Sequence, residues 1–259
     1  MREIKLNKFN AKTVEDATQS FINFSREIEQ TEFLIVFLYI GSIYINNDLE
    51  KAKELLIDLY EDKDNEVSAT MVEYFRTEKA DLLFDPLFYE RHFSQMSFTR
   101  SIDNFVTYFK EILAEVVNKK PQILKSKDQE RIDFILEYES MDDLLKAISE
   151  KKIEELFYKG ISDIEKYFKD RLGIELFKDE ETKNAINRLI KLRNLIVHNR
   201  GKFSKEFLHE FPDTNIANGL YCTLKYEEIS EVNFVLHNYL VDLDIEITAK
   251  FNLDLIKTV

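Results

Sequence analysis

One segment of the chain combines a histidine with closely spaced arginine and asparagine side chains. It is Lys191–Gly201, with the sequence KLRNLIVHNRG, and its histidine is His198. Imidazole gains and loses a proton near neutral pH, which suits a general acid or base. A guanidinium such as that of Arg193 binds phosphate oxygens through two parallel hydrogen bonds. These residue types favour chemistry on a phosphate ester, with Arg193 holding the phosphate and His198 moving protons.

The same segment lies inside a basic cluster of an otherwise acidic chain. The formal net charge of the 259 residues is −13, and a uniformly acidic surface repels nucleic acid. Between residues 183 and 205, however, no acidic residue occurs and the basic residues are Lys183, Arg188, Lys191, Arg193, Arg200, Lys202 and Lys205. This density predicts a surface that binds phosphates. The alternative is a patch that meets an acidic patch of a partner chain, such as Asp179–Glu181.

A helix over Glu181–Asn199 is expected to carry the segment, and Gly201 lies just past its end. Asn194 and His198 are four residues apart and share one face of that helix. Arg193 and His198 are five residues apart, which places them about 140° apart around the axis. Three arrangements can bring them together. The helix loosens near His198, the long Arg193 side chain reaches around it, or a symmetric dimer joins two copies.

The rest of the chain predicts an all-α helical bundle. Its 5 glycines and 3 prolines leave few residues for tight turns, which favours long helices joined by short polar loops. Apolar residues recur at helical spacing in several segments, and we expect helices over Glu15–Gln30, Asp48–Tyr60, from Phe98 to a stop before Pro121, from Ser140 onward, over Ile153–Leu172 with a stop at Gly173, and over Ile229–Phe251. The apolar run Phe33–Ile45 spans about 20 Å as a helix, short of a bilayer core of roughly 30 Å, so we expect a buried helix there.

Composition also limits the class of protein. The single cysteine, Cys222, excludes an intramolecular disulfide and a cysteine-based zinc site, and it fits a reducing cytosol. The first residues, Met1–Lys12, are mixed and polar and predict no signal peptide. No HExxH, CxxC, Walker A, GxGxxG or GxSxG pattern occurs. We therefore expect a soluble cytoplasmic protein that needs no metal or other cofactor and does not bind a membrane.

The run Arg193–His198, followed by Asn199-Arg200-Gly201, resembles the Arg-x4-6-His motif of the HEPN superfamily. The resemblance is specific over Leu189–Gly201, and the helical pattern from about Phe98 to Phe251 suits a HEPN-like domain. It implies an all-α fold, a homodimer and, in many members, a metal-independent ribonuclease of toxin–antitoxin, abortive-infection or other antiviral systems. We accordingly divide the chain into a helical N-terminal region of unknown role, residues 1–95, and a HEPN-like domain, residues 96–259.

The resemblance implies roles for individual residues. Arg193 and His198 become the catalytic pair of an endoribonuclease in which the RNA 2′-hydroxyl attacks the phosphate, and Asn194 orients His198 or contacts the phosphate. The residues expected to bind RNA are Arg188, Lys191, Asn199, Arg200 and Lys202. An antitoxin or another defence protein is the expected protein partner.

Two other interpretations of the sequence stay open. One is a catalytically silent HEPN module that dimerises and binds RNA, a nucleotide or a partner. The other is a helical interaction protein whose basic strip serves only an acidic partner. The remaining histidines carry weaker signals: His92 and His237 are expected at the surface or core edge, and His209 is near enough in sequence to approach the site.

Overall fold

The computed structural model describes residues 14–61, 66–77, 86–125, 129–214 and 221–258. Its elements in chain order are β1 (Asp16–Ala17), α1 (Gln19–Asn47), α2 (Leu49–Glu61), α3 (Glu66–Phe75), α4 (Pro86–Lys119), the 3-10 turn η2 (Pro121–Leu124), α5 (Ile132–Leu136), α6 (Met141–Lys159), α7 (Ile161–Tyr167), the π-helical turn η3 (Phe168–Leu172), α8 (Glu180–Asn199), α9 (Lys205–Glu210), α10 (Tyr226–Phe251) and β2 (Ile256–Lys257). The prediction of an all-α fold is confirmed. The described strands, β1 and β2, pair antiparallel and bring Asp16 beside Lys257.

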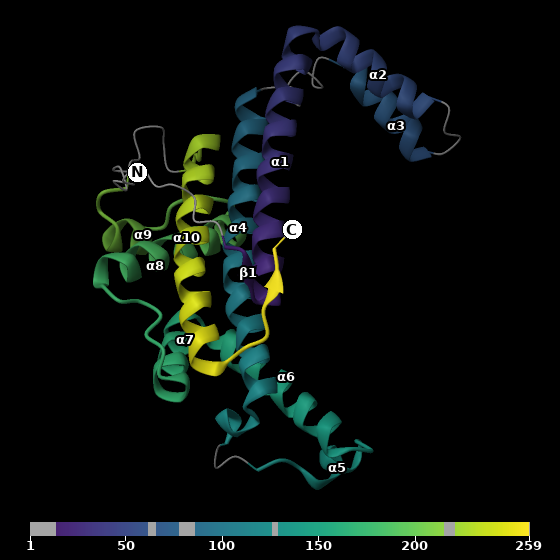
Figure 1. The fold of residues 1–259 in the computed structure, drawn as a ribbon. Coiled ribbons are helices and arrows are strands. Elements are labelled where there is room, and N and C mark those ends of the chain that lie inside the picture. The colour runs from purple at the N-terminus through teal and green to yellow at the C-terminus, as the bar shows by residue number, and fades with distance from the viewer. Residues whose placement is uncertain (1–13, 62–65, 78–85, 126–128, 215–220, 259) are drawn as a thin grey trace.

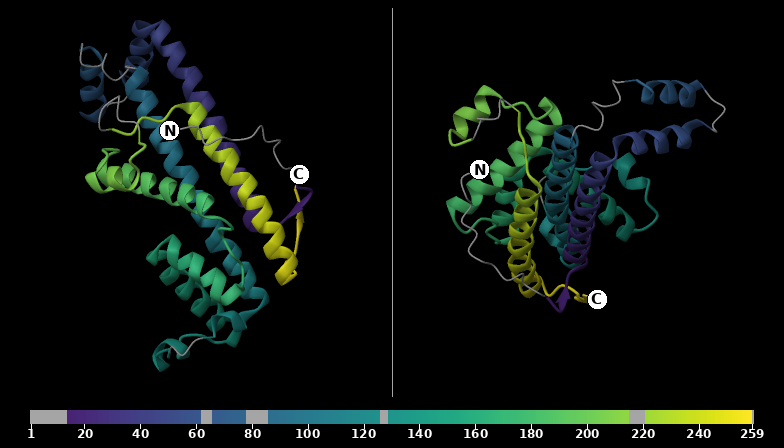
Figure 2. Two further views of the ribbon diagram at one scale, coloured as in Figure 1. Left: turned by 90° about the vertical axis from the view of Figure 1, so that its left-hand side faces the viewer. Right: turned by 90° about the horizontal axis from the view of Figure 1, so that it is seen from above.

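Three long helices form the central bundle (Figure 1). Helix α1 lies beside α4 and α10 and runs antiparallel to both, as the colours in Figures 1 and 2 show. Their shared core contains large aromatic and aliphatic side chains that are almost fully buried, among them Phe24, Phe98, Phe105 and Leu236. Helix α4 runs without a break through the predicted boundary at residue 95, and Phe24 shares one core with Phe105. The two predicted regions are thus parts of one packed bundle.

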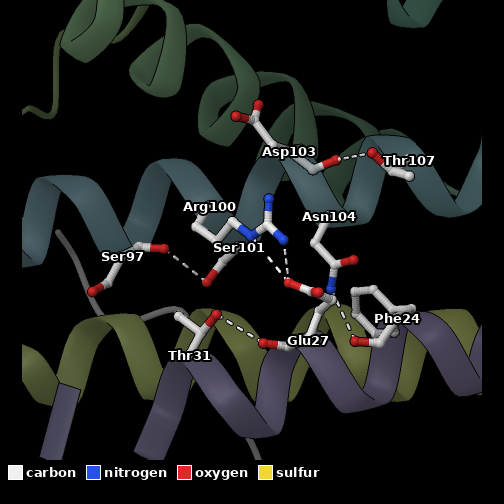
Figure 3. Close-up of polar contacts among 9 residues, drawn as sticks. All are labelled: Phe24, Glu27, Thr31, Ser97, Arg100, Ser101, Asp103, Asn104 and Thr107. Atoms are coloured by element: carbon white, nitrogen blue, oxygen red, sulfur yellow. Dashed lines mark hydrogen bonds and ion pairs between the residues drawn. The ribbon is translucent and has the colours of Figure 1, made fainter. Parts of the chain in front are cut away.

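Polar side chains fix the contact between α1 and α4 (Figure 3). Arg100 forms an ion pair with Glu27, and the Asn104 amide donates a hydrogen bond of 2.9 Å to the backbone oxygen of Phe24. Asp103 lies between these two positions on α4 but points away from α1. It therefore presents a carboxylate to the opposite side of α4, where α8 packs.

The prediction that Phe33–Ile45 is a buried helix is wrong. This run is the second half of α1, which is continuous from Gln19, and Phe33, Phe37 and Tyr44 are 75%, 65% and 74% exposed. Ile35, by contrast, is 7% exposed and belongs to the core. A run that is apolar on every face contains no polar face to reveal which side meets solvent.

Some other helix boundaries follow the expected signals, but Gly160 interrupts the helix predicted over Ile153–Leu172, and α4 begins at Pro86 instead of near Phe98. Ser140 caps α6, with its hydroxyl accepting a hydrogen bond from the Asp143 backbone, and Gly173 ends η3 in the left-handed conformation. Helices α8 and α10 lie within a few residues of the predicted ranges. In the described part of the chain, no helix is both long and apolar enough to span a membrane.

Candidate active site

Helix α8 presents the predicted segment from a firmly held scaffold. Asp179 caps its first turn, with Oδ1 accepting a hydrogen bond of 2.7 Å from the Thr182 backbone. Its apolar stripe faces the core through the buried residues Ile186, Leu189, Leu192, Leu195 and Ile196. The polar residues between them are therefore left on the outer faces. Helix α8 stays α-helical as far as Asn199. Of the three arrangements that could bring Arg193 to His198, a helix that loosens near His198 is therefore not the one observed.

The turn after α8 is docked against α4. Arg200 and Gly201 both adopt left-handed backbone conformations, with φ of 54° and 75°. A Cβ atom on Gly201 would lie 2.4 Å from Nε2 of Gln95, a residue of α4, so the Gln95 side chain would have to shift, and the positive φ independently favours glycine. Gln95 Nε2 also donates to the Cys222 backbone oxygen at 2.9 Å, and the Cys222 amide donates to the Gly201 oxygen at 2.7 Å. These contacts fix where the segment after His198 lies.

Arg193 and His198 face different surroundings. Arg193 turns toward α4, where its Nε lies 2.7 Å from Oδ1 of Asp103, and its Nη1 donates to Oδ1 of Asn194 at 3.0 Å. The contact with Asp103 is an ion pair whose N–H is not aligned for a hydrogen bond. The structure therefore keeps Arg193 out of the cavities that His198 lines, and one copy of the chain does not bring the predicted pair together.

His198 is exposed and lies where two cavities meet. The smaller cavity, of about 330 Å³, is lined by Lys191, Asn194, Leu195, His198, Asn199, Ser204, Glu206, Phe207 and Glu210. The larger, of about 690 Å³, is lined by Arg91, His92, Gln95, His198, Asn199, Arg200, Lys202 and Tyr221. Two carboxylates line the smaller cavity, whereas every charged side chain among the described residues that line the larger one is basic. Of the two, the larger is the better site for an anion.

The predicted basic surface is narrower than the sequence indicates, because internal carboxylates neutralise much of it. Lys183 pairs with Glu165 at 2.9 Å and Arg188 pairs with Asp213 at 2.8 Å. Lys191 pairs with Glu210 on α9. Arg188 and Lys191, both predicted to bind RNA, are thus engaged within the chain. They are not available as free cations without breaking these pairs.

Arg200 and Lys202 behave differently. Both are exposed, and neither has a carboxylate partner among the residues that the structure describes. Asn199, between His198 and this pair, donates from its side chain to the Lys202 backbone oxygen at 2.5 Å and stabilises the turn. The structure therefore brings together His198, Asn199, Arg200 and Lys202 of the predicted site.

Sequence reasoning missed the wall that α4 contributes. Arg91, His92 and Gln95 lie about one hundred residues before His198, so only the tertiary packing places them in the same cavity. Tyr221 closes the cavity from the segment that follows α9, and its backbone pairs with that of Lys202. The guanidinium of Arg91 lies 5.6 Å from the centre of the Tyr221 ring. No local pattern marks these residues, although His92 was one of only four histidines.

The remaining histidines lie elsewhere. His209 is exposed on α9 and lines neither cavity. His237 packs against Phe21, with 5.3 Å between ring centres, and contacts the Ser25 hydroxyl at 3.0 Å. Burial lowers the pKa of His237, although a hydrogen bond with Asn238 opposes this shift. Within the described ranges, no group of three or more His, Cys, Asp or Glu side chains is placed to hold a metal ion.

Comparison of the chain with protein-family models, with curated proteins and with solved structures found no match.

Proposed function

We propose that this chain is a metal-independent endoribonuclease with its active site at the C-terminal end of α8, around His198. The observation that carries the proposal is the position of this imidazole, exposed on a cavity of about 690 Å³ whose charged lining, in the part of the chain that the structure describes, is all basic. In a chain of net charge −13, such a cavity is a local site for phosphate. The resemblance of Arg193–Gly201 to the HEPN motif adds support from the sequence.

The reaction uses a nucleophile that RNA itself supplies. A neutral imidazole takes the proton of the 2′-hydroxyl while O2′ forms a bond to phosphorus. The bond from phosphorus to O5′ breaks, and an imidazolium donates a proton to the leaving oxygen. The products are a 2′,3′-cyclic phosphate and a 5′-hydroxyl. Arg200 and Lys202 bind the phosphates on either side, and DNA resists because it lacks the 2′-hydroxyl.

In this proposal Arg193 acts once Asp103 releases it. The two side chains are 27% and 41% exposed and the contact lacks hydrogen-bond alignment, so a phosphate can compete for the guanidinium. A homodimer of the HEPN kind offers a second route, in which Arg193 of one copy approaches His198 of the other. Asn194, which accepts a hydrogen bond from Arg193, supports the orientation of the guanidinium.

We place this activity in the cytoplasm, in a toxin or antiviral-defence effector that a partner such as an antitoxin holds in check. A second candidate is a silent HEPN module that binds RNA or a partner without cleaving it. The ion pair between Arg193 and Asp103 favours this candidate, because it occupies the arginine that catalysis requires.

The test is cleavage of single-stranded RNA by purified protein in EDTA, with analysis of the fragment ends. Wild type is expected to leave cyclic phosphates, and His198→Gln is expected to lose about 10²–10⁴-fold in rate. His209→Gln is the matched control, because this exposed histidine on α9 lines neither cavity. RNA binding without cleavage by wild type supports the silent module, whereas equal cleavage by wild type and His198→Gln overturns the assignment of His198.

A further inference from the structure

The larger cavity at His198 has a second wall that the motif does not contain. Arg91 and His92 lie on α4, at the end of the helix that packs against the turn after α8. The contact of Gln95 with Gly201 and Cys222 holds this part of α4 against the turn. The two walls are therefore fixed relative to each other within one copy of the chain.

We propose that α4 supplies the other half of the RNA site, with His92 as the second proton-transfer residue and Arg91 as a ligand of the phosphate. This inference rests on the proposed ribonuclease function and extends it. It assigns a complete acid–base pair, His92 and His198, to a single chain. The second proton-transfer group then needs no second copy of the chain, and Arg193 adds to phosphate binding where Asp103 releases it.

The charges around the cavity select its ligand. Arg91 lines it from α4, Arg200 and Lys202 line it from the turn after α8, and none of the described residues that line it carries a carboxylate. In the smaller cavity, by contrast, Glu210 neutralises Lys191. A phosphodiester is therefore expected in the larger cavity, where charge-assisted hydrogen bonds to guanidinium and ammonium groups hold it.

Two imidazoles on one phosphodiester match the proton transfers that cleavage requires. One ring, neutral, takes the proton from the 2′-hydroxyl as the bond from O2′ to phosphorus forms. The other, protonated, donates a proton to O5′ as the bond from phosphorus to O5′ breaks. No oxidant, reductant or co-substrate is needed, and the two protons exchange with water between turnovers.

The aromatic side of the cavity indicates the form of RNA. Tyr221 is 46% exposed, and the Arg91 guanidinium lies over its ring, 5.6 Å from the ring centre. Proteins recognise unpaired bases by stacking them on tyrosine rings and guanidinium planes. A base next to the scissile phosphate reaches these groups only when it is unpaired, so the substrate class is single-stranded RNA.

The experiment combines binding and cleavage so that the two proposals can fail separately. Binding is measured with a fluorescent 2′-O-methyl RNA oligonucleotide, which cannot be cleaved, and cleavage with the matching unmodified RNA in EDTA across a pH series. Arg91→Gln is expected to weaken binding about tenfold. Arg100→Gln, which removes the same charge from the same helix but faces α1, is expected to bind as wild type does.

His92→Gln is expected to bind nearly as well as wild type, to cleave about 10²-fold more slowly or worse, and to lose one limb of a bell-shaped pH profile. His209→Gln is expected to keep both limbs. A lost limb identifies a proton-transfer role, since a purely structural loss lowers the rate at every pH alike. Thermal melts of each variant exclude unfolding, and His92→Asn provides a second replacement if His92→Gln melts early.

If His92→Gln cleaves with the full wild-type profile while His198→Gln does not cleave, the inference is overturned and the ribonuclease proposal stands. If wild type leaves the RNA intact, the ribonuclease proposal is overturned, and with it the catalytic role of His92. In that case a loss of binding in Arg91→Gln alone still supports the phosphate site. Equal binding by Arg91→Gln and Arg100→Gln overturns that site too.

Discussion

The ion pair of Arg193 with Asp103 joins α8 to α4, with 2.7 Å between Nε and Oδ1. It turns the guanidinium away from His198, which follows five residues later and opens onto the cavities. The Asp103 carboxylate thus contacts the Arg193 guanidinium, which is proposed to bind a phosphate.

Asp103→Asn removes the competing negative charge and leaves the shape of the side chain. RNA affinity and the cleavage rate are expected to rise, because Arg193 then becomes available to phosphate. The free energy of unfolding is expected to change by less than about 1 kcal/mol, since the pair is partly exposed. Glu154→Gln, which breaks the partly exposed pair of Glu154 with Lys110, is the control for net charge. A fall in RNA affinity in Asp103→Asn but not in Glu154→Gln would contradict the proposal that Asp103 competes with phosphate for Arg193.

Arg200 and Lys202, which have no carboxylate partner within the described ranges, predict the salt dependence of RNA binding. Replacing Arg200 or Lys202 by Gln is expected to reduce the slope of log K against log salt by about 0.7 for each lost phosphate contact. Lys183→Gln is expected to leave the slope unchanged, because Lys183 pairs with Glu165 at 2.9 Å. The measurement is a titration of 2′-O-methyl RNA at several salt concentrations. Equal slopes for all three variants would place the RNA elsewhere.

Gly201 is expected to be intolerant of a side chain. Its φ of 75° and the approach of Gln95 make Gly201→Ala unfavourable, by about 1–2 kcal/mol from the left-handed backbone alone. The same change is expected to slow cleavage, because it displaces the turn that carries Arg200. Gly41→Ala is the control: a Cβ atom there meets nothing within 4 Å, and removing a helical glycine stabilises by about 0.5–1 kcal/mol. Chemical denaturation of both variants measures the difference.

His237 predicts a pH dependence of stability that is separate from catalysis. Because burial lowers its pKa in the folded state, the unfolded chain takes up the proton first as the pH falls. The free energy of unfolding of wild type is therefore expected to decrease as the pH drops from about 7 through the ordinary histidine value of about 6.5. His237→Gln, which retains a polar group near Ser25, is expected to show a smaller decrease. Denaturation curves are measured for both proteins at each pH, and the carboxylates that the two proteins have in common cancel in the comparison. An equal decrease of the free energy of unfolding in wild type and His237→Gln would contradict the prediction.

Local patterns were sufficient for α8, the helix that carries the predicted segment. The cap at Asp179, the apolar stripe of α8 and the glycine after Arg200 are determined by neighbours within a few residues. The sequence also placed His198 and the basic residues after it on one short stretch of chain. These features depend on the helical repeat and on turn chemistry, so no distant contact is needed to explain them.

Tertiary packing decided which of those residues face a common cavity. Asp103 neutralises Arg193, and Glu210 neutralises Lys191, from elements that sequence spacing does not connect. Arg91 and His92 reach the site only because α4 crosses the bundle beside the end of α8. Packing likewise left Phe33 exposed, although the sequence around it is apolar on every side. A helix's own period determines the directions of its side chains, but their electrostatic partners and their exposure depend on what packs against each face.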